Sequence, residues 1–418
     1  MGLTLEGLKS LVAGDTVAIR GMAVLEPAGG PGDKIFPPTH AVNDSNKKPG
    51  AKYAFEKRRI DGQETTCVLI DSVQSQANRM EEALQTLWDE KKIVLPVLSV
   101  DFSSVAPEVG RVTSLTAPHR IADAILRDSL LNGQLFRLSD IGRSFVDASP
   151  QDATALFKVC PTGLVFGLWD STGPKGGLGA KFQRALVSEI VGINAAHGSK
   201  SASRIDPLNI AKDAAVLYKS RSAAEMWTAN PEEAEKDENG QPVKVGKDEK
   251  AGKPSAVLHG NVAPTIDSIG GGVTIDEARH TVVLSLASLR RLGFRSGGDE
   301  ARTVLAALGM LAVLAGESRG YDLRSRCLLV PRSGSALRLE AVARDGTPAP
   351  VALDLEGAIA LYVEAVDRLP GGIKFAKPTG EALAPGEALA ELQPSPKLLE
   401  LVRKSRELAA AAVELGDE

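Results

Sequence analysis

The chain has 418 residues, 43% of them apolar and 4% aromatic, and its 49 basic and 53 acidic residues give a net charge of −4. This composition fits two domains, or one domain enlarged by insertions, and excludes a disordered acidic tail. The three cysteines, Cys67, Cys160 and Cys327, lie too far apart for a disulfide scaffold or a thiolate zinc site. Without a long apolar run or a signal peptide at its start, the chain is expected in the reducing cytoplasm, away from membranes.

Charge is distributed unevenly along the chain. Residues 340–418 contain 14 acidic and 8 basic residues, so residues 1–339 carry a net charge of +2. Three groups of basic residues have few acids near them in sequence. They comprise Lys47, Lys48, Lys52, Lys57, Arg58 and Arg59; Lys158, Lys175, Lys181, Arg184, Lys200 and Arg204; and Arg319, Arg324, Arg326, Arg332 and Arg338. Each group alone is typical of a solvated face, and three groups in one chain weaken this interpretation without deciding against it.

The sequence pattern of the first half of the chain predicts strands, a long loop and one clear helix. Residues 17–25 read as a strand, and the Pro- and Gly-rich residues 27–50 as a loop, which at that length is usually functional or disordered. CVLID, ending at Asp71, reads as a buried strand that runs into a helix with Ser72 as N-cap. Residues 93–100 predict another strand, broken at Pro96.

The second half predicts an insertion followed by further strands and helices. Residues 230–253 are nearly free of apolar side chains and predict a mobile insertion, with a hairpin around Asn239 and Gly240. The other expected elements are a helix from Asp299 through 314, strands at 327–330 and 336–342, and helices at 355–366 and 397–415. Strands and helices alternate irregularly, which predicts an α+β fold with insertions.

A Gly-rich segment, FGLWDSTGPKGGLGAKFQR, covers residues 166–184. Glycines allow backbone N–H groups to approach a phosphate, and Lys181 and Arg184 follow directly to neutralise its charge. The Walker and Rossmann patterns both fail here, since Lys181 follows Ala180 and Phe182 stands where a glycine is required. The alternative interpretation is a flexible surface turn between two strands.

Amide side chains concentrate at the start of the helix that follows Ser72. If the apolar stripe of this helix faces the core, then Gln74, Gln76, Asn78 and Arg79 lie on its flanking or exposed faces. Free N–H groups at a helix start attract phosphate, and amides can donate and accept hydrogen bonds. The alternative is an ordinary helix surface.

The sequence contains few residue patterns that are typical of catalytic sites. The five histidines form no helical pair typical of zinc, and no nucleophile elbow is present, so neither a metal nor a cofactor is expected. Asp71 and Asp170 each end a strand and precede a serine, so turn capping is the favoured interpretation of both.

The passages VLIDSVQSQANRMEEAL and FGLWDSTGPKGGLGAKFQRALVSEIVG together resemble the backbone subunit of type I-G (formerly I-U) CRISPR Cascade complexes, CRISPR-associated family seven of the RAMP superfamily. Shorter agreements are PGDKIFPPT, RRIDGQ, LHGNVAPT and SLASLRRLGF, so the resemblance spans residues 15–370 in order. It implies an RRM-like, ferredoxin-type palm over residues 1–370, with thumb or finger candidates at 27–57 and 230–253. Residues 371–418 would form an acidic C-terminal extension.

The resemblance also implies a function. The chain would be a non-catalytic subunit that binds guide RNA (crRNA), oligomerises along it as a filament and presents it for pairing with target DNA in antiviral defence. Further implied partners are the large subunit, a guide-end-binding or processing subunit, and a helicase-nuclease recruited to the complex.

Thirteen residues are the resulting candidates for RNA contacts. They are Gln74, Gln76, Asn78, Arg79, Lys175, Gly176, Gly177, Lys181, Phe182, Arg184, Arg58, Arg59 and His259. The family resemblance implies that five of them, Gln76, Asn78, Arg79, Lys181 and Arg184, would hold the guide backbone. No RNP-type aromatic motif is present, which fits backbone rather than base recognition.

Two rival functions stay open at this stage. A RAMP endoribonuclease would process guide precursor or cut target RNA, with Asp71 or Asp170, or with His40, His119 or His197 as general base. A metabolic enzyme would instead use the Gly-rich loop for a nucleotide phosphate.

Overall fold

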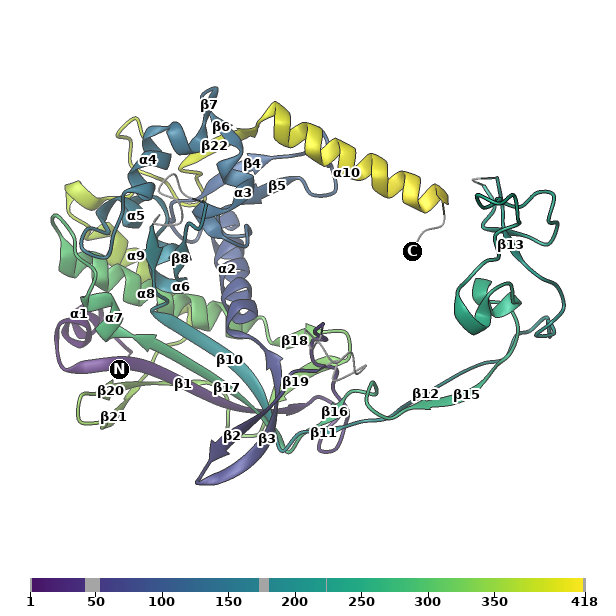
Figure 1. Cartoon of the computed structure of the whole chain (residues 1–418). Coiled ribbons are helices and arrows are strands. Elements are labelled where there is room, and N and C mark those ends of the chain that lie inside the picture. The colour runs from purple at the N-terminus through teal and green to yellow at the C-terminus, as the bar shows by residue number, and fades with distance from the viewer. Residues whose placement is uncertain (1, 42–52, 173–179, 223, 416–418) are drawn as a thin grey trace. The chain divides into compact units, whose positions relative to one another are not determined.

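The computed structural model describes residues 2–41, 53–172, 180–222 and 224–415 (Figure 1), with side chains up to 409 in the last helix. The chain divides into two compact units. Unit 1 comprises residues 1–196 and 273–399, and unit 2 comprises 197–272 and 400–418. Antiparallel strands and helices both contribute to unit 1, so the predicted α+β class is confirmed.

The main sheet of unit 1 is antiparallel in every described pairing. Its strand order is β18 (Tyr321–Arg324), β19 (Cys327–Pro331), β1 (Thr16–Pro27), β17 (Glu277–Ser285), β10 (Leu186–Ile193), β3 (Gln63–Asp71) and β2 (Phe55–Ile60), with β20 (Arg338–Ala343) and β21 (Pro348–Val351) added beside β1. The strands predicted at 17–25, 67–71, 327–330 and 336–342 are therefore present, with small shifts at their ends.

Side chains alternate across the centre of this sheet. Ile19, Leu284 and Leu186 lie opposite one another on β1, β17 and β10, and each is 2% exposed. The next row, which includes Arg20 and Val283, points to the other face and is exposed. One face of the sheet is thus covered and the other faces solvent, as a period of two in a half-buried sheet requires.

Two long helices provide most of the cover, α2 (Val73–Asp89) and α8 (Gly298–Ser318), which pack on each other (Figure 1). A Cβ at Gly309 of α8 would lie 3.0 Å from Leu284 of β17, so this glycine permits a close helix-to-sheet approach. Helix α8 is long and apolar enough to cross a membrane, but 78% of its apolar window is buried in unit 1, as in a core helix. Helices α1 (Leu5–Ala13) and α9 (Leu355–Asp367) also pack against α8.

A second, smaller sheet completes unit 1. Its strand order is β5 (Arg111–Thr113), β4 (Leu98–Asp101), β22 (Ala390–Pro394), β6 (Ser129–Leu131) and β7 (Gln134–Leu135). The strand predicted at 93–100 begins only at Leu98, because Pro96 has no N–H for a ladder. Through β22, residues 371–399 belong to unit 1, whereas the sequence assigned them to a C-terminal extension with 400–418.

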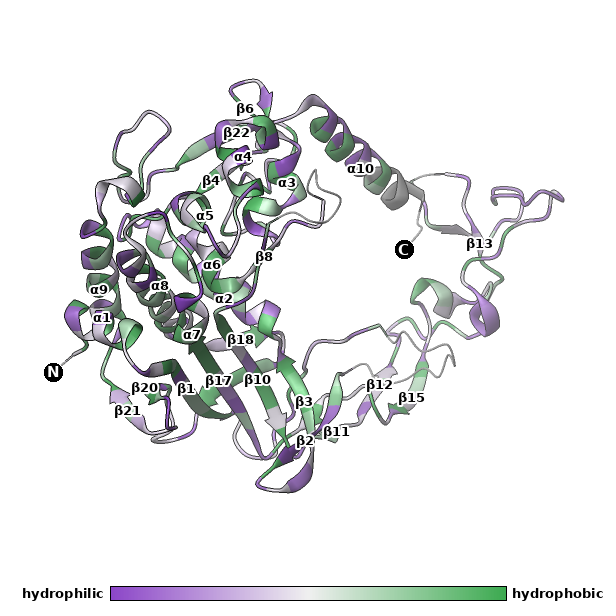
Figure 2. Cartoon of the chain, turned by 60° about the vertical axis from the view of Figure 1, so that its left-hand side comes forward, coloured by the Kyte–Doolittle hydropathy of each residue, from purple (hydrophilic) through white to green (hydrophobic). Residues whose placement is uncertain are grey.

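Unit 2 consists of short paired strands and most of the last helix. Its strands are β12 (Lys200–Arg204) with β15 (Val262–Asp267) and β13 (Tyr218–Lys219) with β14 (Trp227–Thr228). The predicted hairpin around Asn239 and Gly240 is present: the Asp237 N–H donates to the Gln241 carbonyl and the Gly240 N–H to the Asp237 carbonyl, both at 2.9 Å. Helix α10 (Pro396–Leu415) carries both hydrophobic and hydrophilic residues in the part coloured in Figure 2.

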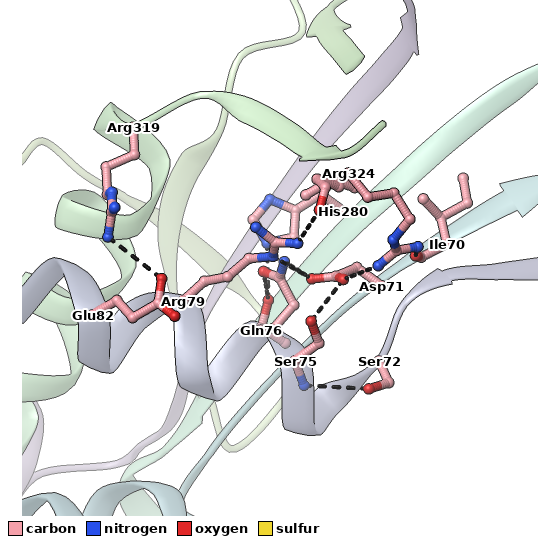
Figure 3. Close-up of polar contacts among 12 residues, drawn as sticks. Ile70, Asp71, Ser72, Ser75, Gln76, Arg79, Glu82, His280, Arg319 and Arg324 are labelled. Carbon is pink, nitrogen blue, oxygen red and sulfur yellow. Dashed lines mark hydrogen bonds and ion pairs between the residues drawn. The ribbon is translucent and has the colours of Figure 1, made fainter. Parts of the chain in front are cut away.

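A buried carboxylate joins the end of β3 to α2 (Figure 3). Asp71 is fully buried and accepts hydrogen bonds from Ser75 Oγ at 2.8 Å, Gln76 Nε2 at 2.7 Å, Arg79 Nε at 3.0 Å and Arg324 Nη2 at 3.1 Å. The helix itself starts as predicted, since Ser72 Oγ accepts from the Ser75 N–H. The cap predicted for Asp71 is thus supplied by Ser72, and Asp71 instead pairs with two arginines from different elements.

The network continues beneath α2 into the sheet. Gln76 Oε1 accepts from Ser188 Oγ at 3.0 Å, and Ser188 Oγ lies 2.8 Å from His280 Nε2. His280 Nδ1 in turn lies 3.1 Å from the Tyr321 hydroxyl. Burial lowers the pKa of His280 to about 4, so this ring is neutral near pH 7.

Replacing Leu308, which is fully buried in α8, with Ala should lower the free energy of unfolding by about 2–5 kcal/mol, because a cavity remains at the centre of the core. The matched control is Leu408→Ala on α10, where the side chain is 72% exposed and the change should stay within about 0.5 kcal/mol. Urea unfolding of the full chain measures both. Equal losses in the two variants would contradict the assignment of α8 as the core helix.

His280 should make stability depend on acid pH. The unfolded histidine binds a proton below pH 6.5, whereas the buried ring binds one only near pH 4, so acidification favours the unfolded chain. Up to about 3 kcal/mol should be lost between these pH values through this group. The His280→Gln variant should show a correspondingly flatter profile in urea unfolding at a series of pH values. His40→Gln, at an exposed position, is the control, and parallel wild-type and His280→Gln profiles would refute the assignment.

Candidate nucleic-acid interface

The Gly-rich segment forms a hairpin. Its strands are β8 (Leu168–Trp169) and β9 (Lys181–Phe182), in which Leu168 lies opposite Phe182 and Trp169 opposite Lys181. A further bond, from the Asp170 N–H to the Ala180 carbonyl at 3.0 Å, continues the pairing. Lys175, Gly176 and Gly177 lie outside the described residues.

Alternation along the hairpin separates a buried from an exposed pair. Leu168 and Phe182 are 5% and 4% exposed, whereas Trp169 is 58% exposed. Lys181 is exposed too, and its Nζ lies 5.4 Å from the centre of the Trp169 ring, at cation–π distance. The predicted contact residue Phe182 therefore belongs to the packing of the hairpin, and Lys181 to its surface.

The hairpin and the start of α2 line one cavity of about 1310 Å³, here called the cationic groove. Gln74 and Asn78 come from α2, and Lys181, Phe182 and Arg184 from the hairpin and the residues after it. The two sequence segments that suggested phosphate binding, about 100 residues apart, thus meet at a single site in unit 1.

The lining of the groove has one sign of charge. Its described cations are Arg120, Arg127, Lys181, Arg184 and Arg291, and no carboxylate lies among the described residues that line it. Arg127 is paired with Asp128 at 2.7 Å, which raises the pKa of Arg127. Arg291 donates to Ser288 Oγ at 3.2 Å, and within the described ranges Arg184 makes no ion pair. Low-dielectric walls with one sign of charge focus the field toward an anionic ligand.

A buried ion pair fixes the hairpin to α2. Arg120 donates to both Glu81 carboxylate oxygens, at 2.6 and 2.7 Å, and to the Gly167 carbonyl at 3.1 Å. Burial raises the pKa of Glu81, and the Arg120 charge opposes that rise. Gly167 itself has φ +87°, and a Cβ there would lie 2.8 Å from Arg184 Cγ. The path of the chain into β8 therefore requires glycine at this position.

Two of the predicted contact residues on α2 are engaged elsewhere. Gln76, expected on a flanking or exposed face, is 6% exposed, because both ends of its amide are used by Asp71 and Ser188 inside the network. Arg79 bonds to Asp71 and donates to the Leu323 carbonyl at 2.6 Å. The expected exposure of Gln76 is therefore wrong. Of the four candidates on α2, Gln74 and Asn78 line the groove, and Gln76 and Arg79 do not.

The remaining described candidates, Arg58, Arg59 and His259, are not among the residues that line the groove. On β2, Arg58 donates hydrogen bonds to the carboxylates of Glu56 and Glu189, each at 2.6 Å. The hydrogen bond to Glu189 raises the pKa of Arg58 above its ordinary value. Arg59 is exposed and donates to the Gly62 carbonyl. His259 lies in unit 2, with its ring 6.1 Å from that of Trp227. The first basic group is only partly described, since Lys47, Lys48 and Lys52 lie outside the described residues.

The residues considered for catalysis are dispersed. Asp170 is 1% exposed and accepts from Arg137 Nη2 at 2.5 Å and from the Thr172 N–H at 3.2 Å, in agreement with the turn-capping prediction. His119 lines the groove, whereas His40 and His197 are exposed outside it. Over the described ranges, no group of three His, Cys, Asp or Glu residues is placed to hold a metal ion.

Sequence reasoning missed Trp169, Arg120, Arg127 and Arg291. Trp169 lies inside the quoted Gly-rich motif. The available signal for its exposure was its position directly after the apolar Leu168, because neighbouring residues of a strand point to opposite faces. The three arginines gave no such signal, because only the tertiary fold brings them to the hairpin.

Residues 19–197 match the model of a family described as "CRISPR-associated protein GSU0053". No curated protein sequence matches the chain. The crystal structure of Thermofilum pendens Csc2 is similar at 10% identity, over 98% of this chain and 80% of that chain, with a TM-score of 0.25. A score this low carries no weight for the fold, which rests on the strand order above.

The matched family segment contains α2, the Gly-rich hairpin and both long motifs on which the sequence resemblance depended. Over residues 19–197 the chain is therefore similar to a CRISPR-associated family, in agreement with the resemblance of its sequence.

Proposed function

We propose that the protein binds guide RNA as a Cascade backbone subunit and that the cationic groove holds the RNA backbone. The observation that carries this proposal is the lining of the groove, where five cations and no carboxylate lie among the described lining residues. Two of them, Arg120 and Arg127, pair with Glu81 and Asp128 outside the lining, so Lys181, Arg184 and Arg291 are the cations proposed to meet the RNA. Polyanion binding rests on such cations, because each neutralised phosphate releases counterions. The amides of Gln74 and Asn78 add hydrogen-bonding groups suited to sugars and phosphates.

The strand order supports a ferredoxin-type, RRM-like palm as part of the proposal. Across the sheet, β19, β1, β17 and β10 are neighbours, with α2 between β1 and β10 in sequence and α8 between β17 and β19. This is the order 4-1-3-2 of a βαββαβ unit. No described residue of β1, β17 or β10 lines the groove, so the RNA would follow the hairpin and α2 rather than the open sheet.

The finer parts of the proposal concern assembly. In it, several copies follow one type I-G guide as a filament in the cytoplasm and present its bases to target DNA, together with the large subunit, the guide-end subunit and the helicase-nuclease. Residues 27–57 and an insertion that includes 230–253 supply thumb and finger. In this proposal, the inserted residues 197–272 of unit 2 contact another subunit.

Replacing Lys181 or Arg184 with Ala should weaken RNA binding for every sequence, because each change removes a phosphate contact. The slope of log K against log salt should fall in magnitude by about 0.7 for each lost contact. Fluorescence anisotropy with single-stranded RNA over a salt series measures this. Arg344→Ala, a solvent-exposed arginine that does not line the groove, should leave the slope unchanged. An altered sequence preference with an unchanged slope would contradict phosphate binding here.

The proposed subunit is non-catalytic, and the most direct challenge comes from His119 in the groove. Purified protein incubated with guide precursor or target RNA should leave both intact, with or without divalent metal, since Asp71 and Asp170 are occupied by arginines. Denaturing gels report the outcome. Cleavage that disappears in His119→Ala or Asp170→Ala but persists in His40→Ala would establish the endoribonuclease instead.

A further inference from the structure

We propose that Trp169 is a stacking platform for one unpaired RNA base at the edge of the cationic groove. This inference rests on the proposed RNA-binding function and deepens it, since it adds base stacking to a site otherwise built for phosphate. The protein has three tryptophans with distinct environments: Trp88 is 1% exposed in the core, Trp227 lies in unit 2, and Trp169 lines the groove. Of the three, Trp169 is the most exposed, at 58%.

The position of Trp169 is fixed by its surroundings. Its backbone is held in the β8–β9 pairing, and the neighbouring Gly167 carbonyl accepts from Arg120, itself tied to Glu81 of α2. Alternation then directs Leu168 into the core and the Trp169 ring to the surface. A large apolar ring held in this way at the edge of a groove is preorganised to receive a flat ligand.

The neighbours of the ring match the chemistry of a nucleotide. A base can stack on the indole, while Lys181, whose Nζ is 5.4 Å from the ring centre, is within reach of the adjoining phosphate. Because every base has a π-face, stacking would not select one base over another. Double-stranded RNA would fit poorly, because its bases are already stacked, so the ligand is a single strand with an unstacked base at this point.

Stacking and phosphate binding respond differently to salt, which separates the two roles. Trp169→Ala should weaken the binding of single-stranded RNA about 5- to 150-fold, the range given by about 1–3 kcal/mol per stacked base, with the salt slope unchanged. Trp169→Phe should recover most of the affinity. Lys181→Ala, by contrast, should lower the slope.

Tryptophan fluorescence provides a readout that a merely structural role would not change. In full-length Trp227→Phe protein freed of nucleic acid, the exposed indole is Trp169, because Trp88 is buried. Adding single-stranded RNA of mixed sequence should quench this signal, and a matched strand with abasic sites should bind more weakly with little quenching.

The outcomes distinguish the two proposals. If Lys181→Ala lowers the slope while Trp169→Ala binds normally and no quenching occurs, the stacking proposal fails and the RNA-binding function stands. If quenching is equal with abasic RNA, the ring senses the strand without stacking, and the proposal fails as well. If wild-type protein does not bind RNA at all, both fail. A Trp169→Ala variant that binds RNA normally but no longer self-associates would assign the ring to a protein interface instead.

Discussion

The buried carboxylate of Asp71 is the constraint on which the arrangement of unit 1 depends. Removing a charge from water costs several kcal/mol unless it is paired and hydrogen-bonded, and here two arginines, a serine and a glutamine meet that requirement. These donors come from α2 and β18, so the end of β3 can be satisfied only when all three elements are in place. A second buried pair, Glu81 with Arg120, then ties the same helix to the hairpin. Two buried ionic contacts therefore fix the position of α2, whose start lines the groove.

Electrostatics at the groove differ from those of the chain as a whole. The net charge of −4 would argue against a polyanionic partner, yet the cations gather where the described lining has no acid. Elsewhere, arginines of the basic groups are neutralised locally: Arg58 by Glu56 and Glu189, Arg324 by Asp71. What an approaching ligand experiences is the local field, and a sum over the sequence does not report it.

Local signals were sufficient for the elements but not for the roles of single residues. The strand CVLID, the cap at Ser72 and the apolar spacing behind it predicted β3 and α2 closely. Gln76 could not be placed in this way: it lies on the buried side of α2 because Asp71 and Ser188 satisfy its amide, and Ser188 is 112 residues away. Arg120 and Arg291 reach the groove only through tertiary packing. Periodicity identifies a face, whereas partners across the fold decide whether a polar residue on it is buried.

The strand order also determines when the first strand can pair during synthesis of the chain. The described partners of β1 are β17, β19 and β20, and the first of these begins at Glu277. During synthesis at about 5–20 residues per second, the first strand therefore leaves the ribosome tens of seconds before any strand it can pair with. The insertion at 197–272 lengthens this interval. An unpaired edge is prone to misassociation, so the architecture that places β1 at the centre of the sheet leaves this strand exposed in the nascent chain until the last third of the chain begins to emerge.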